Sequence, residues 1–432
     1  MKKNYAFILV YLFSIIYSYG QQDELIYKYR QMAVEYQQQI KIAKSDFAGA
    51  ESTFEATKAD FLPKLDLTGD YTYLGNAIQF PSEGVGQPGE ELSNTYSLGL
   101  GVFQPIVTGG YLKHNKNVAL SQVEVMRNYI TLNEQDVMIN SDALYWDVVT
   151  KKEINSIQIE YRNSIGQFLK VIQDRVDEEV VGMNELYQTK VRYNDAEYEV
   201  IKSNKEYLIS LMKLNRIIGQ PISAQSTVAD SLQAVNIIGL NGNLTEKAFS
   251  QRSEIEILKN TVLMNESNEK ITSSKYNPQL GVGAGGNWGA PSVGFSTEPD
   301  FNYNIYAKLV VPVFHWGKRK DEVFASRQKT EVSKLEMDET KDLIGLEVET
   351  SYNDLQLTQQ QLNFAFNSLD NAQKNVDVML DRYYEGLSSV LEVLDAQLFW
   401  QKTYFNYIQA KYELNFAHSN YQRAMGELSV NP

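Results

Sequence analysis

Residues 64–73 read KLDLTGDYTY, a stretch in which apolar and polar side chains alternate. Because successive side chains of an extended chain point to opposite faces, Leu65, Leu67, Tyr71 and Tyr73 share one face. This pattern predicts a strand with one apolar and one polar face. The stretches that alternate in this way are expected at about 64–74, 95–104, 279–288 and 301–311. Each is roughly ten residues long, the length of a tilted strand that crosses a membrane.

The four stretches fall into two pairs because the chain repeats itself. An offset of 207 residues superimposes separated landmarks, and before the paired prolines the offset becomes 215, which places Pro63 on Pro278. The pairs at the first offset include Pro105 and Pro312, Gly110 and Gly317, Tyr145 and Tyr352, Arg175 and Arg382, and Gly219 and Gly426. A fixed period across such landmarks indicates a duplicated architecture.

Each repeat has the order helix, strand, strand, very long helix, return helix, with the opening helices expected at about 23–58 and 244–275. The first repeat is expected at 21–221, with its long helices within about 113–217, and the second at 244–428, with its long helices within about 319–426. Residues 222–243, which contain Ser, Gly and Asn, are expected to link the repeats, and 429–432 form a tail. In the second long helix apolar residues recur with 4-3 spacing, which predicts a left-handed coiled coil with Phe366 in the buried row.

The first residues predict export from the cytoplasm. Lys2 and Lys3 precede an apolar run at 5–19, and small residues, Ser18 and Gly20, end it, so residues 1–20 are expected to be a signal peptide rather than a membrane anchor. No later stretch approaches the ~18 consecutive apolar residues of a membrane-spanning helix. If the mature chain enters a membrane, we therefore expect it to do so as strands, in an outer membrane.

Composition excludes several classes of protein. The formal net charge is -14, with 40 Lys and Arg against 54 Asp and Glu, so nucleic acid is not an expected partner. With no cysteine, the chain has no disulfide, thiolate metal site or cysteine nucleophile. The 28 tyrosines suit a membrane interface.

No motif indicates catalysis, a cofactor or a metal. Gly281, Gly283 and Gly286 fit the GxGxxG spacing, but they lie inside an alternating strand instead of opening a helix. The three histidines are isolated, and no GxSxG occurs. We therefore expect a protein that is not an enzyme and that has no cofactor and no metal ligands.

Four strands cannot close a barrel, because eight is the smallest number known for a membrane barrel. An open sheet in lipid leaves backbone N–H and C=O groups unpaired, each at a cost of several kcal/mol. Several copies of the chain must therefore contribute strands to one barrel. The alternative is a periplasmic coiled-coil adaptor or scaffold protein whose strands form a soluble module.

Several short motifs accompany this order of elements. They are the strand-to-helix corners Phe103-Gln104-Pro105-Ile106 and Val311-Pro312-Val313-Phe314, and the stretches Arg382-Tyr383-Tyr384-Glu385-Gly386-Leu387 and Val393-Leu394-Asp395-Ala396-Gln397. In these motifs and in the order of its elements, the chain resembles the TolC-like outer membrane efflux proteins. The resemblance implies an α+β membrane protein that assembles as a homotrimer, with a β-barrel in outer membrane lipid and an α-helical tunnel in the periplasm. It also implies docking to a periplasmic adaptor and an inner-membrane pump, in an efflux or type I secretion system. Drug, metal and protein remain open as cargo.

The resemblance places gating residues at the turns between the long and return helices. Glu392 and Asp395 align with acidic rings at the periplasmic entrance, and Glu185 is the first-repeat counterpart. Tyr383 aligns with a gate-bridging tyrosine, and Arg175 and Arg382 stand at the same turns. Where the family can carry an arginine that holds the entrance shut, this chain has Ser388 or Ser389.

Adaptor contact is expected at the ends of these turns. By resemblance, it involves Gly386, Leu387 and Ser388 in the second repeat. The matching positions of the first repeat are Glu179, Val180 and Val181.

Overall fold

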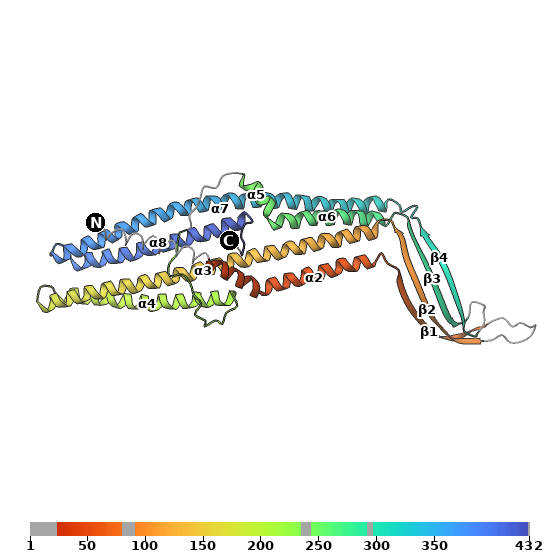
Figure 1. Cartoon of the computed structure of the whole chain (residues 1–432), viewed down its shortest axis with the longest axis horizontal. Helices are drawn as coiled ribbons and strands as arrows, with labels where there is room; N and C mark the ends of the chain where they lie inside the picture. The colour runs from red at the N-terminus through yellow and green to blue at the C-terminus, as the bar shows by residue number, and fades with distance from the viewer. Residues whose placement is uncertain (1–23, 80–90, 235–242, 292–296, 431–432) are drawn as a thin grey trace, which may run out of the picture. The chain divides into compact units, whose positions relative to one another are not determined.

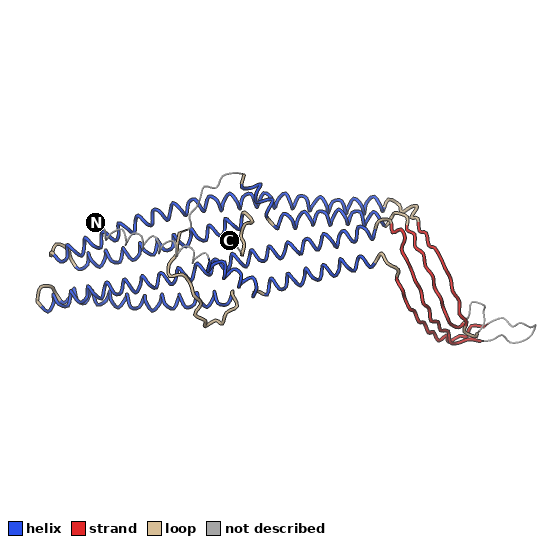
Figure 2. Tube along the Cα trace, in the orientation of Figure 1, coloured by secondary structure: helices blue, strands red, loops and turns tan. Residues whose placement is uncertain are grey.

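The computed structural model describes residues 24–79, 91–234, 243–291 and 297–430. The expected signal peptide at 1–20 lies outside these ranges, as do part of the linker and residues 431–432 of the tail. The described chain is mostly helical with a four-stranded antiparallel sheet, which confirms the expected fold class (Figure 2).

The chain divides into two compact units, and each unit takes segments from both repeats. The sheet unit comprises Lys44–Asn128 and Glu256–Glu339. The tip unit comprises Met1–Ala43, Tyr129–Ile255 and Thr340–Pro432. Corresponding parts of the two repeats therefore belong to the same unit, and the repeat boundaries at 21–221 and 244–428 stay a prediction from the sequence.

The sheet has the strand order β1-β2-β3-β4 (Figure 1). Its strands are β1 (Lys64–Gln79), β2 (Glu91–Thr108), β3 (Gln279–Ala290) and β4 (Asp300–Val310). Both strands of the first hairpin extend beyond the alternating core that marked them in the sequence. β2 and β3 pair across the junction of the two repeats, with Val102 opposite Ala284.

The helices repeat in length as well as in order. The long helices α3 (Tyr111–Asp177) and α7 (Lys318–Tyr384) each have 67 residues, and the return helices α4 (Met183–Ile217) and α8 (Val390–Ala424) each have 35. The remaining helices are 24–36, α2 (Gln38–Ala59), α5 (Leu244–Gln251) and α6 (Ser253–Ser274). These equal lengths are consistent with duplication.

The expected single helix over 244–275 is wrong. Arg252, between α5 and α6, has φ -73° and ψ 125°, an extended conformation that ends α5. The buried Arg252 guanidinium forms ion pairs with Glu254 at 2.7 Å and Glu347 at 2.9 Å. These two ion pairs fix the break, which helix periodicity in the sequence does not reveal.

The predicted heptad row of α7 is confirmed along most of the helix and is wrong at Phe366. Val348, Leu355 and Leu362 are buried as expected, but Phe366 is 55% exposed. Ala365 and Ala372 lie one position earlier and face the core in its place.

Two buried ion pairs fasten segments of the tip unit that are distant in sequence. Arg30 and Asp142 approach to 2.6 Å with side chains 4% and 0% exposed, and Lys411 and Glu153 approach to 2.5 Å. Glu153 also accepts a hydrogen bond from the backbone N–H of Leu232 at 3.0 Å. The N-terminal helix, α3, α8 and the segment after α4 are therefore joined by buried charge.

No helix in the described part of the chain is both long enough and apolar enough to cross a bilayer.

Candidate gating site at the helix tips

The two turns between long and return helices share one backbone design. We call residues 175–185, between α3 and α4, the first tip, and residues 382–395, between α7 and α8, the second tip. In the second tip the N–H of Leu387 donates to Arg382 O at 2.8 Å and that of Gly386 to Tyr383 O at 3.0 Å. The first tip has the same two bonds 207 residues earlier in the chain. The N–H of Val180 donates to Arg175 O at 2.8 Å, and that of Glu179 donates to Val176 O at 3.0 Å. Both are the pattern that ends a helix through one left-handed residue.

The two tips have different residues at the position with a left-handed backbone conformation. Gly386 has φ 76°, and glycine adopts this conformation without steric cost. The counterpart in the first tip is Glu179, which has φ 61°. Gly182 of the same tip instead precedes α4 in an extended conformation. The first tip therefore holds a strained residue where the second has glycine.

Arg175 connects the end of α3 to the end of α7. Its guanidinium donates to Tyr383 O and Tyr384 O, both at 3.2 Å, and lies 4.4 Å from the centroid of the Tyr383 ring. The ring is buried against Phe168 with centroids 5.1 Å apart. Burial raises the pKa of Tyr383, Arg175 opposes that shift, and Glu185 adds to it. Three expected gating residues are therefore neighbours.

Arg382, the second-repeat counterpart of Arg175, acts within its own turn. It donates to Leu387 O at 3.3 Å, and Ser388 Oγ donates to Met379 O at 3.1 Å. Neither side chain of this pair reaches the first tip through a hydrogen bond in the described chain. These two bonds stay within the end of α7 and the turn that follows it, where Leu387 is 63% exposed.

Glu392 caps its own helix. Its carboxylate accepts hydrogen bonds from the backbone N–H of Ser389 at 2.7 Å and from Ser389 Oγ at 2.9 Å, and the Glu392 N–H donates to Ser389 Oγ at 3.3 Å. This reciprocal arrangement is a capping box. The hydrogen bonds from the Ser389 backbone and hydroxyl, together with nearby Arg382, hold the pKa of Glu392 below its usual value. The exposed carboxylate is ionised and held at the start of α8.

Asp395 lies one turn further along α8 and has a partner from α4. Arg192 Nη2 is 3.4 Å from Asp395 Oδ1, and the two side chains are 31% and 60% exposed. Glu185, in the first turn of α4, is half-buried and has its charge at the favourable end of the helix dipole. The structure therefore brings Asp395 to Arg192, and Glu185 near Tyr383.

A groove runs between the N-terminal parts of α4 and α8. Its volume is about 470 Å³, and its lining combines exposed apolar side chains with a few polar ones. The lining residues are Tyr187, Gln188, Val191, Arg192, Asp195, Leu391 and Leu394. Sequence reasoning missed this groove and Arg192, although Arg192 lies seven residues after Glu185 and hence near the same face of a helix.

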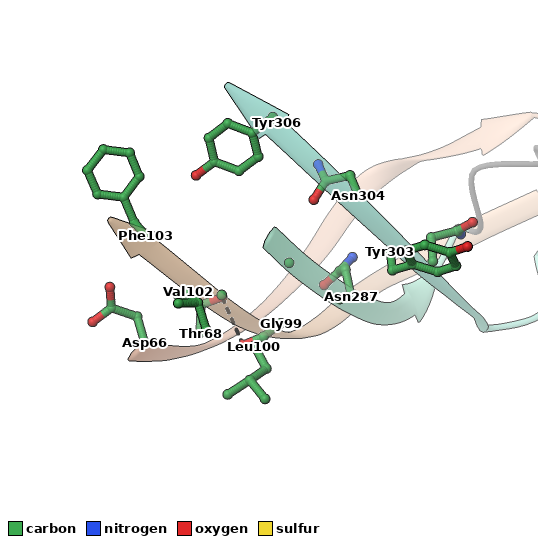
Figure 3. Close-up of a pocket in the computed structure, with 14 residues that line it drawn as sticks. Asp66, Thr68, Gly99, Leu100, Val102, Phe103, Asn287, Tyr303, Asn304 and Tyr306 are labelled. Carbon is green, nitrogen blue, oxygen red and sulfur yellow. Dashed lines mark hydrogen bonds between the residues drawn. The ribbon is translucent and has the colours of Figure 1, made fainter. Parts of the chain in front are cut away.

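The sheet unit carries the other candidate surface, a polar face opposite an apolar one. Thr68, Gly99, Asn287 and Asn302 stand opposite one another across all four strands. Figure 3 shows the hollow of about 560 Å³ over this face, with Thr68 donating to Gly99 O. The other face exposes large apolar side chains, including Leu67 (69%), Tyr71 (69%), Tyr303 (79%) and Ile305 (82%). An exposed apolar face of this kind requires a partner or lipid.

Solved outer membrane channels share this fold. The Campylobacter jejuni CmeC outer membrane channel matches with a TM-score of 0.77 at 16% identity, covering 94% of this chain and 87% of that one. The Vibrio cholerae outer membrane protein VceC matches with a TM-score of 0.77 at 13% identity, covering 94% and 96%. A duplicated chain of long paired helices and a two-faced sheet thus has the architecture of outer membrane channels.

The sequence comparison identifies the family. A family model for outer membrane efflux proteins matches residues 29–220 and 261–427, which is well over half of the chain. The chain belongs to the outer membrane efflux protein family. This confirms the resemblance to TolC-like proteins and the outer membrane location, and because the family consists of channels, the chain is not an enzyme.

One curated relative is the pyoverdine export outer membrane protein OpmQ of Pseudomonas aeruginosa. It is 23% identical over 192 residues, and the match covers 44% of this chain. The match spans 40% of the length of that relative.

Proposed function

We propose that this protein is a passive export duct in the outer membrane, closed by three copies of the chain. The observation that carries the proposal is the two-faced sheet: one face exposes rows of Leu, Ile, Tyr and Phe, and the other is lined by Gly, Asn and Thr. The apolar face suits lipid and the polar face suits a water-filled lumen. Three copies are what the TolC-like resemblance implies.

The helix tips are the proposed gate. The tie from Arg175 to Tyr383 and Tyr384 holds the end of α3 against the end of α7 within one chain. If the entrance closes by gathering these ends, breaking the tie frees them to separate. Asp395 and Glu185 then carry negative charge near the entrance, and Glu392 adds a fixed charge at the start of α8.

The tips are also the proposed docking site for a periplasmic adaptor that links the duct to an inner-membrane pump. Leu387 and Val180 are both 63% exposed at equivalent places in the two turns. The groove between α4 and α8 offers further apolar surface with Tyr187 57% and Leu391 54% exposed. A partner with an apolar helical hairpin fits such surfaces.

The cargo is proposed only by class. The name of OpmQ says that it exports pyoverdine, so a small secreted molecule is the first cargo to test. The polar face of the sheet supports a cargo that travels in water.

The test is ion conduction by the purified protein in a planar bilayer. We expect discrete conductance steps with a preference for cations, because the chain has a formal net charge of -14. A protein that inserts into no bilayer, or a clear preference for anions, would overturn the proposed lining and gate charges.

A further inference from the structure

Among the described residues of one chain, the edge strands β1 and β4 each have an outer side that pairs with no other strand. The proposed function requires β4 of one copy to pair with β1 of the next, but leaves open which residues face each other. The duplication supplies the missing register. Within one chain, the last strand of the first hairpin, β2, already pairs with the first strand of the second hairpin, β3. The junction between copies likewise joins the last strand of one hairpin, β4, to the first strand of another, β1.

The offsets found in the sequence preserve strand register. Lys64 of β1 pairs with Phe103 of β2. Adding 215 to the first number and 207 to the second gives Gln279 and Val310, which pair in the second hairpin. The two hairpins therefore have the same register once the offsets are applied, so the offsets describe structure as well as sequence.

Applying the same offsets to the β2–β3 junction gives the junction between copies. Gly101 pairs with Gly285, and Leu98 with Trp288. The corresponding positions are Lys308 with Asp70 and Ile305 with Tyr73. We infer that β4 of one copy pairs antiparallel with β1 of a second copy in this register, an inference that rests on the proposed assembly of several chains into one barrel.

The faces of the strands agree with this register. Ile305 and Tyr73 both belong to the exposed apolar face, at 82% and 68% exposure, so the pairing continues the apolar face across the junction. A slip of one residue would turn one strand over and break that continuity.

The aromatic pair of the internal junction also has a counterpart. Tyr96 and Trp288 contact each other across β2 and β3, with ring centroids 5.7 Å apart. Their equivalents are Tyr303 and Tyr73, which lie on the two open edge strands and are 79% and 68% exposed. The inferred register brings these two exposed tyrosines into the same diagonal relationship.

Opposite charges meet in the same register. Lys308 and Asp70 lie on the polar faces of their strands, and both are exposed. Within the described ranges neither forms an ion pair, and Asp70 only accepts a hydrogen bond from Ser97 at 3.4 Å. Opposite charges that face each other across strands stabilise a pair. At the equivalent positions of the β2–β3 junction, Gly101 pairs with Gly285, and neither residue is charged. The charge pair is therefore specific to the inferred junction between copies.

The inferred register does not extend to the corners where β2 and β4 lead into the long helices. Gly109 packs so closely that a Cβ there would lie 2.6 Å from Ser274 O, whereas its counterpart is Trp316, 89% exposed with φ 52°. The indole leaves no room for an equally close contact. We therefore confine the pairing to residues 305–310 and 68–73.

Cysteine crosslinking tests the register directly, because the natural chain has no cysteine. Lys308→Cys with Asp70→Cys should form disulfides between copies, since directly opposed residues have Cα atoms about 4.5–5.5 Å apart. Within one chain the two positions lie three strand spacings apart. Lys308 is also eight residues along β4 from Asp300, the residue level with Asp70, so the two are too far apart for a disulfide. The matched control is Lys308→Cys with Asp66→Cys, which is displaced by four residues or about 13 Å along the strand.

We expect covalent trimers from the first pair, at least about ten-fold more than from the control, because Cα atoms beyond about 7 Å cannot be bridged. Equal crosslinking, or more from the control, overturns the register. If native mass shows trimers but no pair crosslinks, this junction is wrong while the proposed duct stands. If only monomers are found, the proposed duct fails, and the inferred junction fails with it.

Charge reversal gives a second test that needs no cysteine. Lys308→Asp or Asp70→Lys alone should reduce the fraction of trimer that survives heating roughly two- to five-fold, and the two together should restore it. Lys308→Asp combined with Asp66→Lys should not restore it. Equal restoration by both combinations contradicts a direct pairing of Lys308 with Asp70.

Discussion

The guanidinium of Arg175 lies 4.4 Å from the centroid of the Tyr383 ring and donates hydrogen bonds to the carbonyl oxygens of Tyr383 and Tyr384. The two residues come from different repeats, so this contact joins the end of α3 to the end of α7. A cation at this place also satisfies carbonyl groups that every helix leaves open at its C-terminus. Among the residues that the structure describes, Arg175 is the one side chain of the first tip that donates hydrogen bonds to the second tip.

Arg175→Gln should loosen the gate. The variant loses the cation–π contact and charge-assisted hydrogen bonds, together worth about 1–3 kcal/mol. We expect a several-fold rise in open probability, measured by single-channel recording in planar bilayers. The matched control is Arg382→Gln, whose arginine bonds within its own turn, and an equal effect of both variants would contradict a special role for Arg175.

The left-handed residues of the tips give a pair of opposite predictions. Glu179→Gly should stabilise the first tip and Gly386→Glu should destabilise the second, each by about 1 kcal/mol, because a non-glycine residue is strained at positive φ. Hydrogen exchange of the amides in each turn measures both changes. Space is open around Gly386, so its substitution tests backbone strain and not a steric clash. A change of the same sign in both variants would rule out this explanation.

Charge selectivity should respond in opposite directions at Asp395 and Arg192. Asp395→Asn removes a negative charge and should lower the ratio of cation to anion permeability. Arg192→Gln removes its partner, 3.4 Å away, and should raise the ratio. Because unit charges at 4 Å interact by about 1 kcal/mol in water, changes on the order of a few-fold are expected. Reversal potentials in a salt gradient measure them, and no change in either variant would remove both residues from the ion path.

The start of α8 should depend on pH through Glu392. Its pKa in the folded chain lies below the unfolded value, so the cap stabilises the helix above the unfolded pKa, about 4.3. That stability is lost as pH falls through the folded pKa. Hydrogen-exchange protection of residues 390–394 should therefore decrease with acid.

Two variants separate the carboxylate from the serine in this cap. Glu392→Gln keeps a side chain that can fill the capping box, so protection should become independent of pH in the acid range. Ser389→Ala removes the hydroxyl cap at a cost of about 1 kcal/mol at neutral pH. If the pH dependence persists in Glu392→Gln, another group is responsible for it.

Much of the fold could be predicted because the strands and the duplication both produce regular patterns in the sequence. The alternation in KLDLTGDYTY marks a two-faced strand, and the offsets of 207 and 215 mark the duplication and the strand register. Features that depend on a single long-range partner could not be predicted. Arg252 ends a helix because it meets Glu254 and Glu347, and nothing in the local sequence distinguishes it from an ordinary helical arginine.

The candidate site shows the same division. The residues at the two tips could be located from the repeat and the family resemblance, but their contacts could not. The family resemblance implies that Glu392 is an acidic residue at an entrance, whereas the structure adds a capping box with Ser389. Asp395 meets Arg192, which is 203 residues away and belongs to the other repeat. Such pairings depend on how α4 and α8 pack, which composition and spacing do not determine.

The most direct measurement is the migration of unboiled protein from isolated outer membranes on a denaturing gel. We expect a heat-sensitive species at about three times the monomer mass, because only several copies can close a barrel from four-stranded sheets. Boiling should convert it to monomer. A monomer found in the soluble fraction after lysis would contradict a membrane duct and would favour a periplasmic coiled-coil protein.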